Sequence, residues 1–334
     1  MRRRLVWILA AFLVAALAGI SYLTRPLGAE GSVLVSRAAP SARPILQLVD
    51  SADSPAAWVV RHGIRTGLWI TGKSVLPGWY HIKPDASALD IIRMIVGGGR
   101  EPLVKVTIPE GFSIGEIAFR LWKRAEVDSA AFLAWCRSDT VCRTYAVEAT
   151  SMEGFLMPDT YFVIRGDDPS YVGHMMAQQA RRLWNQLAGD SLQGGWQQRQ
   201  RIVTLASIVQ LEAGRIDEMP RIAGVYVNRL RIGMRLQADP TVQYLTGKDR
   251  ITGSELRDAS NPYNTYVHAG LPPGPICNPG KAAFTATMNP ESHDWIFFVA
   301  RGDGTMRHRF AVTLAEHNQN VRLYREAIGR APSN

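Results

Sequence analysis

The longest apolar run of the chain lies at its N-terminus, where residues 5–23 carry no charged side chain and follow three arginines at positions 2–4. About 20 apolar residues suffice for a helix to cross a bilayer, so this pattern predicts a transmembrane anchor over residues 5–23. Because Lys and Arg favour the cytoplasmic side, we expect residues 1–4 in the cytoplasm and the rest outside. A cleaved secretory signal is the alternative, since Ala-Leu-Ala at 16–18 resembles a cleavage site. The apolar run continues past it to Leu23, which favours an uncleaved anchor.

Beyond the anchor the pattern changes to short segments. Residues 24–44 are rich in Ala, Ser, Pro and Gly, a composition typical of a tether. Strand-like segments are expected at 78–82 and 104–108, and helical segments at 58–63, 88–96 and from Ser113 onward. This order predicts a small α+β module over residues 45–150.

Longer helical segments dominate the second region, residues 151–330. The pattern predicts helices over 170–187, 197–213, 221–231 and 314–328, and strands over 295–299 and 309–312. Between them, residues 236–279 are rich in Gly, Pro and Asn, and an irregular stretch of this length in a compact domain is usually functional. We therefore predict an α+β fold class: an N-terminal transmembrane helix, a small module, and a mixed α+β domain that carries the chemistry.

Composition changes this picture little. Hydrophobic residues make up 46% of the 334 and charged residues 20%, which is ordinary for a globular protein. The net charge is +9, but the basic residues are scattered and no nucleic-acid motif is present. We therefore expect no nucleic-acid partner and interpret the charge as attraction to anionic surfaces, such as a membrane or an acidic polymer.

The cysteines and histidines exclude several kinds of site. Cys136 and Cys142 could form a disulfide in an exported protein only if a turn separates them, and the sequence leaves this open. No Cys or His cluster has zinc spacing, so no metal and no cofactor are expected. No Ser or Cys lies in a nucleophile motif, which argues against a serine or cysteine hydrolase.

Glu212 is the strongest candidate for chemistry. It lies near the end of the helical stretch 205–213, and the residues one and two turns before it are Ile208, Val209 and Leu205. Desolvation on such an apolar stripe raises the pKa of a carboxyl group, as a general acid near neutral pH requires. The alternative is a glutamate that points into solvent at the last turn of its helix.

The irregular stretch supplies candidate binding residues. Residues 261–266 combine aromatic and amide side chains, and residues 270–280 are stiffened by prolines. Flat rings and amides can line a groove for a polar, sugar-like polymer. A structural brace is the alternative for this stretch, and a structural ion pair is the alternative for Arg229 and Asp239.

Several ordered strings resemble the endolytic murein transglycosylase (YceG-like) family. They are residues 153–161, 206–212, 227–241, 263–266 and 270–280, with a similar closing segment at 298–318. The resemblance implies a protein anchored in the cytoplasmic membrane, with a LysM-like module at 45–150 before a catalytic domain at 151–330 on the periplasmic, extracytoplasmic side. It also implies peptidoglycan glycan strands as the substrate and peptidoglycan synthases as partners.

The resemblance assigns the site residues by position. Glu212 is the implied catalytic acid, whereas Gln210 stands where the family usually has a first acid, and Cys277 stands where a small residue is more usual. By resemblance and residue type, the substrate groove comprises Glu153, Asn228, Gln237, Asp239, Tyr263, Asn264, Thr265 and Tyr266.

The implied reaction needs one carboxyl group. Protonated Glu212 would donate to the glycosidic oxygen between N-acetylmuramic acid and N-acetylglucosamine, and would then take the proton of the sugar's C6 hydroxyl. That hydroxyl closes a 1,6-anhydro ring, so no water is consumed and strand elongation ends. The alternatives are a hydrolytic muramidase, with Asp239 or Glu153 as second carboxylate, and a non-catalytic peptidoglycan-binding scaffold.

Overall fold

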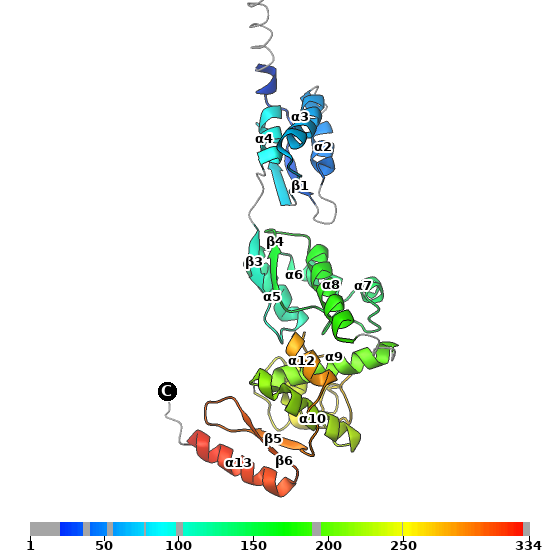
Figure 1. The fold of residues 1–334 in the computed structure, drawn as a ribbon, viewed down its shortest axis with the longest axis vertical. Helices are drawn as coiled ribbons and strands as arrows, with labels where there is room; N and C mark the ends of the chain where they lie inside the picture. The colour runs from blue at the N-terminus through cyan, green and yellow to red at the C-terminus, as the bar shows by residue number, and fades with distance from the viewer. Residues whose placement is uncertain are drawn as a thin grey trace, which may run out of the picture. The chain divides into compact units, whose positions relative to one another are not determined.

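The computed structural model describes residues 21–35, 41–51, 56–76, 78–97, 103–188, 195–248 and 250–329. The chain divides into two compact units, Met1–Leu103 and Val104–Asn334. The described residues form helices and three two-stranded antiparallel sheets (Figure 1). This is an α+β architecture in which each sheet is too small to stand alone and must pack against helices.

The first unit alternates strands and helices. Its elements are β1 (Gly31–Val35), α2 (Arg43–Asp50), α3 (Ala56–Thr71), β2 (Gly78–Ile82) and α4 (Ala88–Gly97). Strand β1 pairs antiparallel with β2, with Gly31 opposite Ile82. The side chains of Ile45, Val60, Tyr80 and Ile91 form a buried core of their own. Ser87 and Asp90 cap the start of α4 reciprocally, as a helix expected after Ser87 requires.

Two features of the first unit differ from the sequence expectation. Strand β1 lies inside residues 24–44, which were expected to be a tether, because residues 31–35 pair with β2. Helix α3 also continues through Gly63, where the pattern predicted its end. A Cβ atom at Gly63 would lie 2.3 Å from the side chain of Ile92 in α4. This glycine therefore permits close helix packing and does not terminate the helix.

The second unit is mainly helical. Its elements are β3 (Val104–Thr107), α5 (Ile114–Ala125), α6 (Ser129–Cys136), α7 (Asp139–Thr144), β4 (Thr160–Val163), α8 (Pro169–Ala188), α9 (Gly195–Glu212), α10 (Met219–Arg231), α11 (Asp239–Thr246), α12 (Lys281–Met288), β5 (Phe297–Ala300), β6 (His308–Ala311) and α13 (Leu314–Gly329). Strand β3 pairs with β4, so residues 104–144 fold with this unit. The sequence placed a functional boundary near residue 150, and that boundary stays a prediction.

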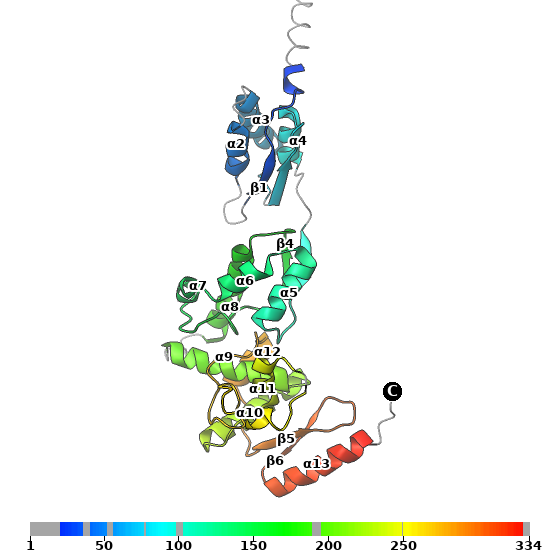
Figure 2. The ribbon, with the colours of Figure 1, turned by 180° about the vertical axis from the view of Figure 1, so that it is seen from behind.

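Helix α9 is the central element of the second unit. Every residue from Val203 to Val209 is buried. The helix packs against α10, α11 and α12, which surround it in Figure 2. Because residues 203–209 are buried on every side, this half of α9 lies in the core of the unit and brings the last residue of the helix, Glu212, to the edge of that core.

The predicted fold class included a membrane-spanning helix over residues 5–23, and this part of the prediction has to be corrected. Within the described residues, no helix combines the length and the apolar character needed to cross a bilayer. Helix α8 reaches 20 residues, but it carries Arg181 and Arg182 among other polar side chains. Only residues 21–23 of the expected span are described, and residues 5–20 lie outside the described part.

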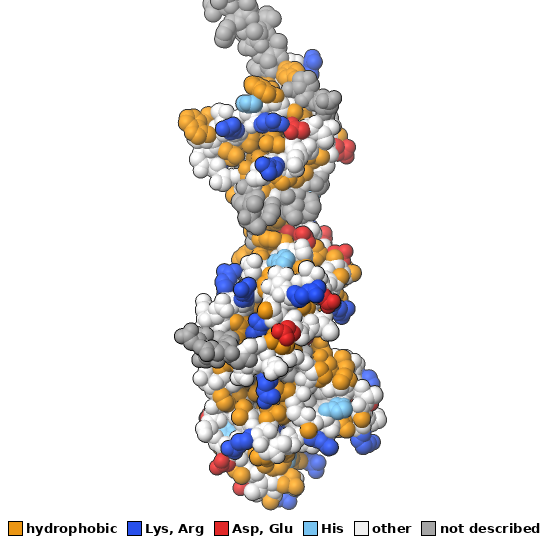
Figure 3. All heavy atoms as spheres, turned by 90° about the vertical axis from the view of Figure 1, so that its right-hand side faces the viewer, with side chains coloured by type: hydrophobic (Ala, Val, Ile, Leu, Met, Phe, Trp, Pro, Cys, Tyr) orange, Lys and Arg blue, Asp and Glu red, His pale blue; other side chains and the backbone are white. Residues whose placement is uncertain are grey.

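The charged side chains and the three cysteines bear on two further expectations from the sequence. On the face drawn in Figure 3, Lys and Arg side chains are scattered among polar and apolar ones. Cys136, Cys142 and Cys277 are buried and free. Cys136 ends α6 and Cys142 lies in α7, so a turn separates them, yet no disulfide joins them.

Candidate active site

Glu212 is the last residue of α9, at the point where the buried helix meets the surface. Ile208 and Val209, one turn earlier, are fully buried. The Glu212 side chain itself is only partly exposed. Burial is the largest influence on its carboxyl group and raises the pKa to about 7. The group is thus reachable from outside and yet holds a proton near neutral pH.

Tyr226 of α10 contacts this carboxyl group directly. Its hydroxyl donates a hydrogen bond of 2.9 Å to Oε1 of Glu212. The Tyr226 ring is 1% exposed and meets Phe298 of β5 edge to face, with 5.8 Å between ring centroids. Burial raises the pKa of Tyr226 well above its ordinary value, so the hydroxyl keeps its proton. The bond stabilises ionised Glu212 and lowers its pKa, opposing the effect of burial.

Arg229, one turn further along α10, is a fixed cation beside this pair. Its Nε donates to the carbonyl of Ile296 at 2.6 Å, and its Nη1 donates to the carbonyl of Leu236 at 2.5 Å. Its guanidinium carbon lies 6.0 Å from the centre of the Tyr226 ring. Arg229 therefore forms no structural ion pair with Asp239, which was the alternative for these two residues. Its charge instead lowers the pKa of Glu212.

Asp239 and Tyr266 complete the cluster. Asp239 is the first residue of α11 and is exposed. The hydroxyl of Tyr266 donates to its Oδ1 at 2.5 Å. The negative charge of Asp239 raises the pKa of Glu212, while burial and then both carboxyl groups raise the pKa of Tyr266. The structure thus brings Glu212, Asp239 and Tyr266 together and adds Tyr226, while the catalytic and groove roles of these residues stay a prediction.

Gln237 lies on a strained turn that leads into Asp239. Its φ of 49° is in the left-handed region, which is uncommon for a residue other than glycine. Thr265 holds this turn: its carbonyl accepts from the Gln237 N–H at 3.1 Å and its hydroxyl from the Ala238 N–H at 3.0 Å. The predicted residue Thr265 is 1% exposed, so it braces the site from behind. Gln237 is exposed and available to a ligand.

Two of the predicted groove residues have amides that are used inside the protein. The Asn264 amide donates to the carbonyls of Glu255, Leu256 and Asp258, and this residue is fully buried. The Asn228 amide donates to the carbonyls of His293 and Trp295. Both residues therefore use their amide N–H groups to hold loops around the cluster, and Asn264 is closed to a sugar because it is fully buried.

Glu153 and Tyr263 belong to a separate network. Glu153 is 4% exposed. Its carboxyl group accepts from the N–H of Ile114 at 3.1 Å, from Asn278 Nδ2 at 2.9 Å and from the hydroxyl of Tyr244 at 3.3 Å. The Tyr244 ring lies 4.9 Å from the ring of Tyr263. Burial raises the pKa of Glu153 to about 7. No hydrogen bond within the described residues joins this network to Glu212.

Sequence reasoning missed Tyr226, although a signal was present. A tyrosine on the apolar face of a helix needs a partner for its hydroxyl, and a nearby unexplained carboxyl group is such a partner. Its role could be recognised only once α9 and α10 were known to pack together. In the described part of the chain, no group of three His, Cys, Asp or Glu side chains gathers as a metal site would require.

The cluster has the parts of a single-acid site. One carboxyl group has a pKa raised to about 7, so that protonated and ionised forms are both present at neutral pH; a tyrosine orients it, and an exposed aspartate and a second tyrosine lie beside it. Such a group can protonate a leaving oxygen and afterwards accept a proton.

Comparison with known proteins places this geometry in a family. The profile of the YceG-like family matches residues 46–323. The endolytic murein transglycosylase of Bacillus subtilis is 29% identical over 264 residues, covering 74% of this chain and 72% of that protein. The protein of the same name from Streptococcus pneumoniae R6 is 26% identical over 332 residues, which cover 89% of this chain but only 59% of that longer protein. A crystal structure of a yceG-like protein from Listeria monocytogenes matches with a TM-score of 0.58 and 26% identity, covering 87% of this chain and 99% of that one.

Proposed function

The chain belongs to the YceG-like family, and on that premise we propose that it is an endolytic lytic transglycosylase of peptidoglycan. It cleaves the bond between N-acetylmuramic acid and N-acetylglucosamine within a strand and leaves a 1,6-anhydro end. The observation that carries the proposal is the Glu212 carboxyl group, partly exposed and with a pKa raised to about 7 by burial. The relatives named endolytic murein transglycosylase support the same reaction.

Glu212 acts first as an acid. In its protonated form it donates to the glycosidic oxygen, and the bond from that oxygen to the muramic acid carbon breaks as positive charge develops on the sugar. The hydrogen bond from Tyr226 to Oε1 fixes the orientation of the carboxyl group, which leaves Oε2 for the proton. A carboxyl group held in this way loses less entropy on reaching the reactive geometry, which lowers the barrier to proton transfer.

Glu212 then acts as a base. Once ionised, it accepts the proton of the C6 hydroxyl while that oxygen closes onto the sugar carbon, so the enzyme returns to its starting state. Tyr226 and Arg229 both favour the ionised carboxylate formed between the two steps, because one donates a hydrogen bond to it and the other is a nearby positive charge.

A hydrolytic muramidase is the second candidate, and Asp239 is the observation that favours it. This exposed carboxylate lies near enough to Glu212 to raise its pKa, and Tyr266 orients it. A second carboxylate of this kind could activate water. We favour the transglycosylase because the relatives carry that name.

Product analysis in water labelled with ¹⁸O separates the two candidates. Purified glycan strands are digested with the wild-type protein, and the new ends are weighed by mass spectrometry. We expect ends that are lighter than a reducing end by one water and carry no label. Reducing ends that contain ¹⁸O would establish a muramidase and refute the transglycosylase.

We also propose that the protein acts on nascent strands outside the cytoplasm, next to peptidoglycan synthases, and so terminates elongation. The location is supported by the proposed substrate, because peptidoglycan lies outside the cytoplasm. Chemical cross-linking in growing cells, followed by mass spectrometry, tests it. Cross-links to a synthase are expected, whereas cross-links confined to cytoplasmic proteins would contradict both the location and the partner.

The first unit is proposed to be the LysM-like, glycan-holding part of the protein. Its separate core supports an independent binding role. Pull-down of the intact protein on insoluble peptidoglycan provides the test, with the Glu212→Gln variant used to prevent cleavage. Retention that survives disruption of the first unit would contradict this role.

A further inference from the structure

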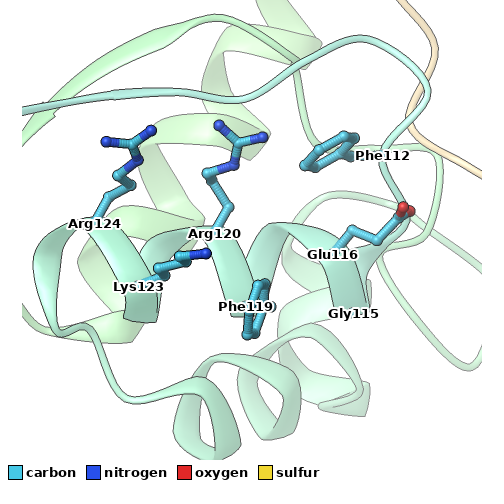
Figure 4. Close-up of a pocket in the computed structure, with 7 residues that line it drawn as sticks. All are labelled: Phe112, Gly115, Glu116, Phe119, Arg120, Lys123 and Arg124. Carbon is cyan, nitrogen blue, oxygen red and sulfur yellow. The ribbon is translucent and has the colours of Figure 1, made fainter.

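A cavity of about 440 Å³ lies along the exposed side of α5, and its lining includes no residue of the Glu212 cluster described above. It is lined by Phe112, Gly115, Glu116, Phe119, Arg120, Lys123 and Arg124. Figure 4 shows the guanidinium groups of Arg120 and Arg124 on the same side of the helix, with the ring of Phe112 beside Arg120. The lining therefore combines cations with aromatic rings.

The three cations of this pocket have no anionic partner in the part of the chain that the structure describes. Among the described residues, Arg120, Lys123 and Arg124 form no ion pair. Arg120 lies 5.2 Å from the centre of the Phe112 ring, and Lys123 lies 5.6 Å from the centre of the Phe119 ring. Lys123 and Arg124 lie in the last turn of α5, where positive side chains interact favourably with the negative end of the helix dipole. This interaction does not account for Arg120, which lies one turn earlier.

The pocket also contains one acid and an exposed ring. Oε2 of Glu116 accepts from the N–H and the hydroxyl of Ser113, each at 2.8 Å, and thereby caps α5. Its Oε1 receives no hydrogen bond from the described residues. Phe119 is 55% exposed. Three positive charges, one carboxylate and apolar surface together suit a ligand that has several carboxylates, aliphatic parts and a positive group.

The start of the pocket adjoins the end of the helix that carries Glu212. Gly111, the neighbour of Phe112, approaches α9 so closely that a Cβ atom there would lie 3.2 Å from the side chain of Leu211. From Gly115 to Arg124 the helix then extends roughly 14 Å. The Phe112 end of the pocket therefore lies beside the end of α9 that carries Glu212, which is the arrangement that a side branch of a bound polymer would need.

We propose that this pocket on α5 binds the acidic peptide stems of peptidoglycan while Glu212 cuts the sugar backbone, an inference that rests on the proposed function. Arg120, Lys123 and Arg124 pair with stem carboxylates, and Arg is well suited to do so because its planar fork matches a carboxylate. Phe119 covers aliphatic parts of the stem. Glu116 would repel a phosphate or pyrophosphate but accept an ammonium group, so the charge pattern favours a peptide.

The test pairs a pocket variant with a control of equal charge. The pocket variant is Lys123→Glu with Arg124→Glu, both exposed. The control is Lys105→Glu with Arg143→Glu, two exposed cations elsewhere in the same unit. Each full-length protein is given strands that bear stems and strands from which an amidase has removed them. Titration calorimetry with the released stem peptides measures binding without any turnover.

We expect the pocket variant to bind free stems about tenfold more weakly than wild type. Its KM for stem-bearing strands should rise by a similar factor with little change in kcat, while cleavage of bare strands stays unchanged. The control should match wild type throughout. Equal behaviour of the two variants, or competition for the pocket by inorganic pyrophosphate but not by stems, would overturn the proposal. Stem binding without cleavage of either strand would instead refute the proposed function and leave the pocket assignment standing.

Discussion

Glu212 and Glu153 both have a raised pKa, but their surroundings give them different roles. Burial raises the pKa of each to about 7. Glu153 is 4% exposed and saturated by donors from Ile114, Asn278 and Tyr244, so its carboxyl group serves structure. Glu212 has one hydrogen-bond donor and keeps access to solvent. A raised pKa therefore identifies a catalytic acid only when the proton can reach a ligand.

The protonation of Glu212 sets the pH dependence of cleavage. The acid must be protonated at the start, so kcat/KM should be level below the pKa of about 7 and fall above it. In Tyr226→Phe the ionised carboxylate loses a donor, its pKa rises, and the alkaline limb should move up by about one pH unit. The pH–rate profile measures this shift.

Tyr266→Phe is the matched control for this prediction, because it removes a tyrosine hydroxyl that contacts Asp239 and leaves the one that contacts Glu212. Its alkaline limb should stay close to that of the wild type, because the hydrogen bond from Tyr226 to Glu212 is kept. An unchanged limb in Tyr226→Phe would show that the hydrogen bond does not act on the catalytic carboxyl group.

Removal of the Glu153 carboxyl group should act on stability. Glu153→Ala leaves three buried donors without an acceptor and should lower the free energy of unfolding by about 2–4 kcal/mol, whereas Glu153→Gln keeps an acceptor and should lose less. Urea titration measures both. A higher KM for Glu153→Gln with unchanged stability would instead indicate that Glu153 binds substrate, as the sequence predicted.

The raised pKa of Glu153 also predicts a pH dependence of stability. The native group binds its proton up to a pH of about 7 and the unfolded group only up to about 4.5. Its contribution is therefore fully present below the lower value and is lost as pH rises through the higher one. Glu153→Gln should flatten this part of the curve of unfolding free energy against pH.

Among the elements, α9 and α12 are joined by Gln210. Its Oε1 accepts a hydrogen bond of 2.9 Å from the N–H of Gly280, the residue that caps α12. This contact gives the amide at position 210 a structural role, at a position where the resemblance led us to expect an acid. Its role here is to hold the loop before α12, for which a carbonyl oxygen suffices.

Substitution of Gln210 tests that role. Gln210→Ala leaves the Gly280 N–H without its acceptor and should cost about 1–2 kcal/mol of unfolding free energy. Gln210→Glu keeps an acceptor and should yield the same anhydro products as wild type. Thermal unfolding and product analysis measure the two effects. A large gain of cleavage in Gln210→Glu would show that the first acid takes part in the chemistry.

Sequence reasoning found most long elements and fewer of the short ones. The periodic segments at α8, α9, α10 and α13 were predicted within a few residues because each has a sustained apolar pattern. Helix α11 was missed inside the irregular stretch, although Asp239-Pro240 is a typical helix start. In the site, residue type identified Glu212, but it could not tell that Asn228 and Asn264 direct their amides inward, because loop packing decides that.

At the scale of the whole molecule, the structure places the division between units after Leu103. Strand β3 pairs with β4, and the side chains of Ile117, Leu121 and Phe132 lie in the same core as α9. Residues 104–150 therefore contribute to the fold that positions Glu212, even though the sequence grouped them with the preceding module.

Truncation tests this division. A chain that begins at Val104 should fold and cleave glycan strands, because it keeps the whole second core. A chain that begins at Ser151 loses β3, α5, α6 and α7 and should not fold. Circular dichroism and cleavage assays report on both. Activity in the shorter chain would place the boundary near residue 150 after all.

The central claim is that Glu212 is the acid and then the base of a transglycosylation. It is tested most directly by comparing wild type, Glu212→Gln and the exposed control Glu110→Gln on purified glycan strands by mass spectrometry. Gln at 212 keeps the contact with Tyr226 but cannot donate the proton, so anhydro ends should form about a thousandfold more slowly. The control should match wild type. Anhydro ends formed by Glu212→Gln at the wild-type rate would contradict the account.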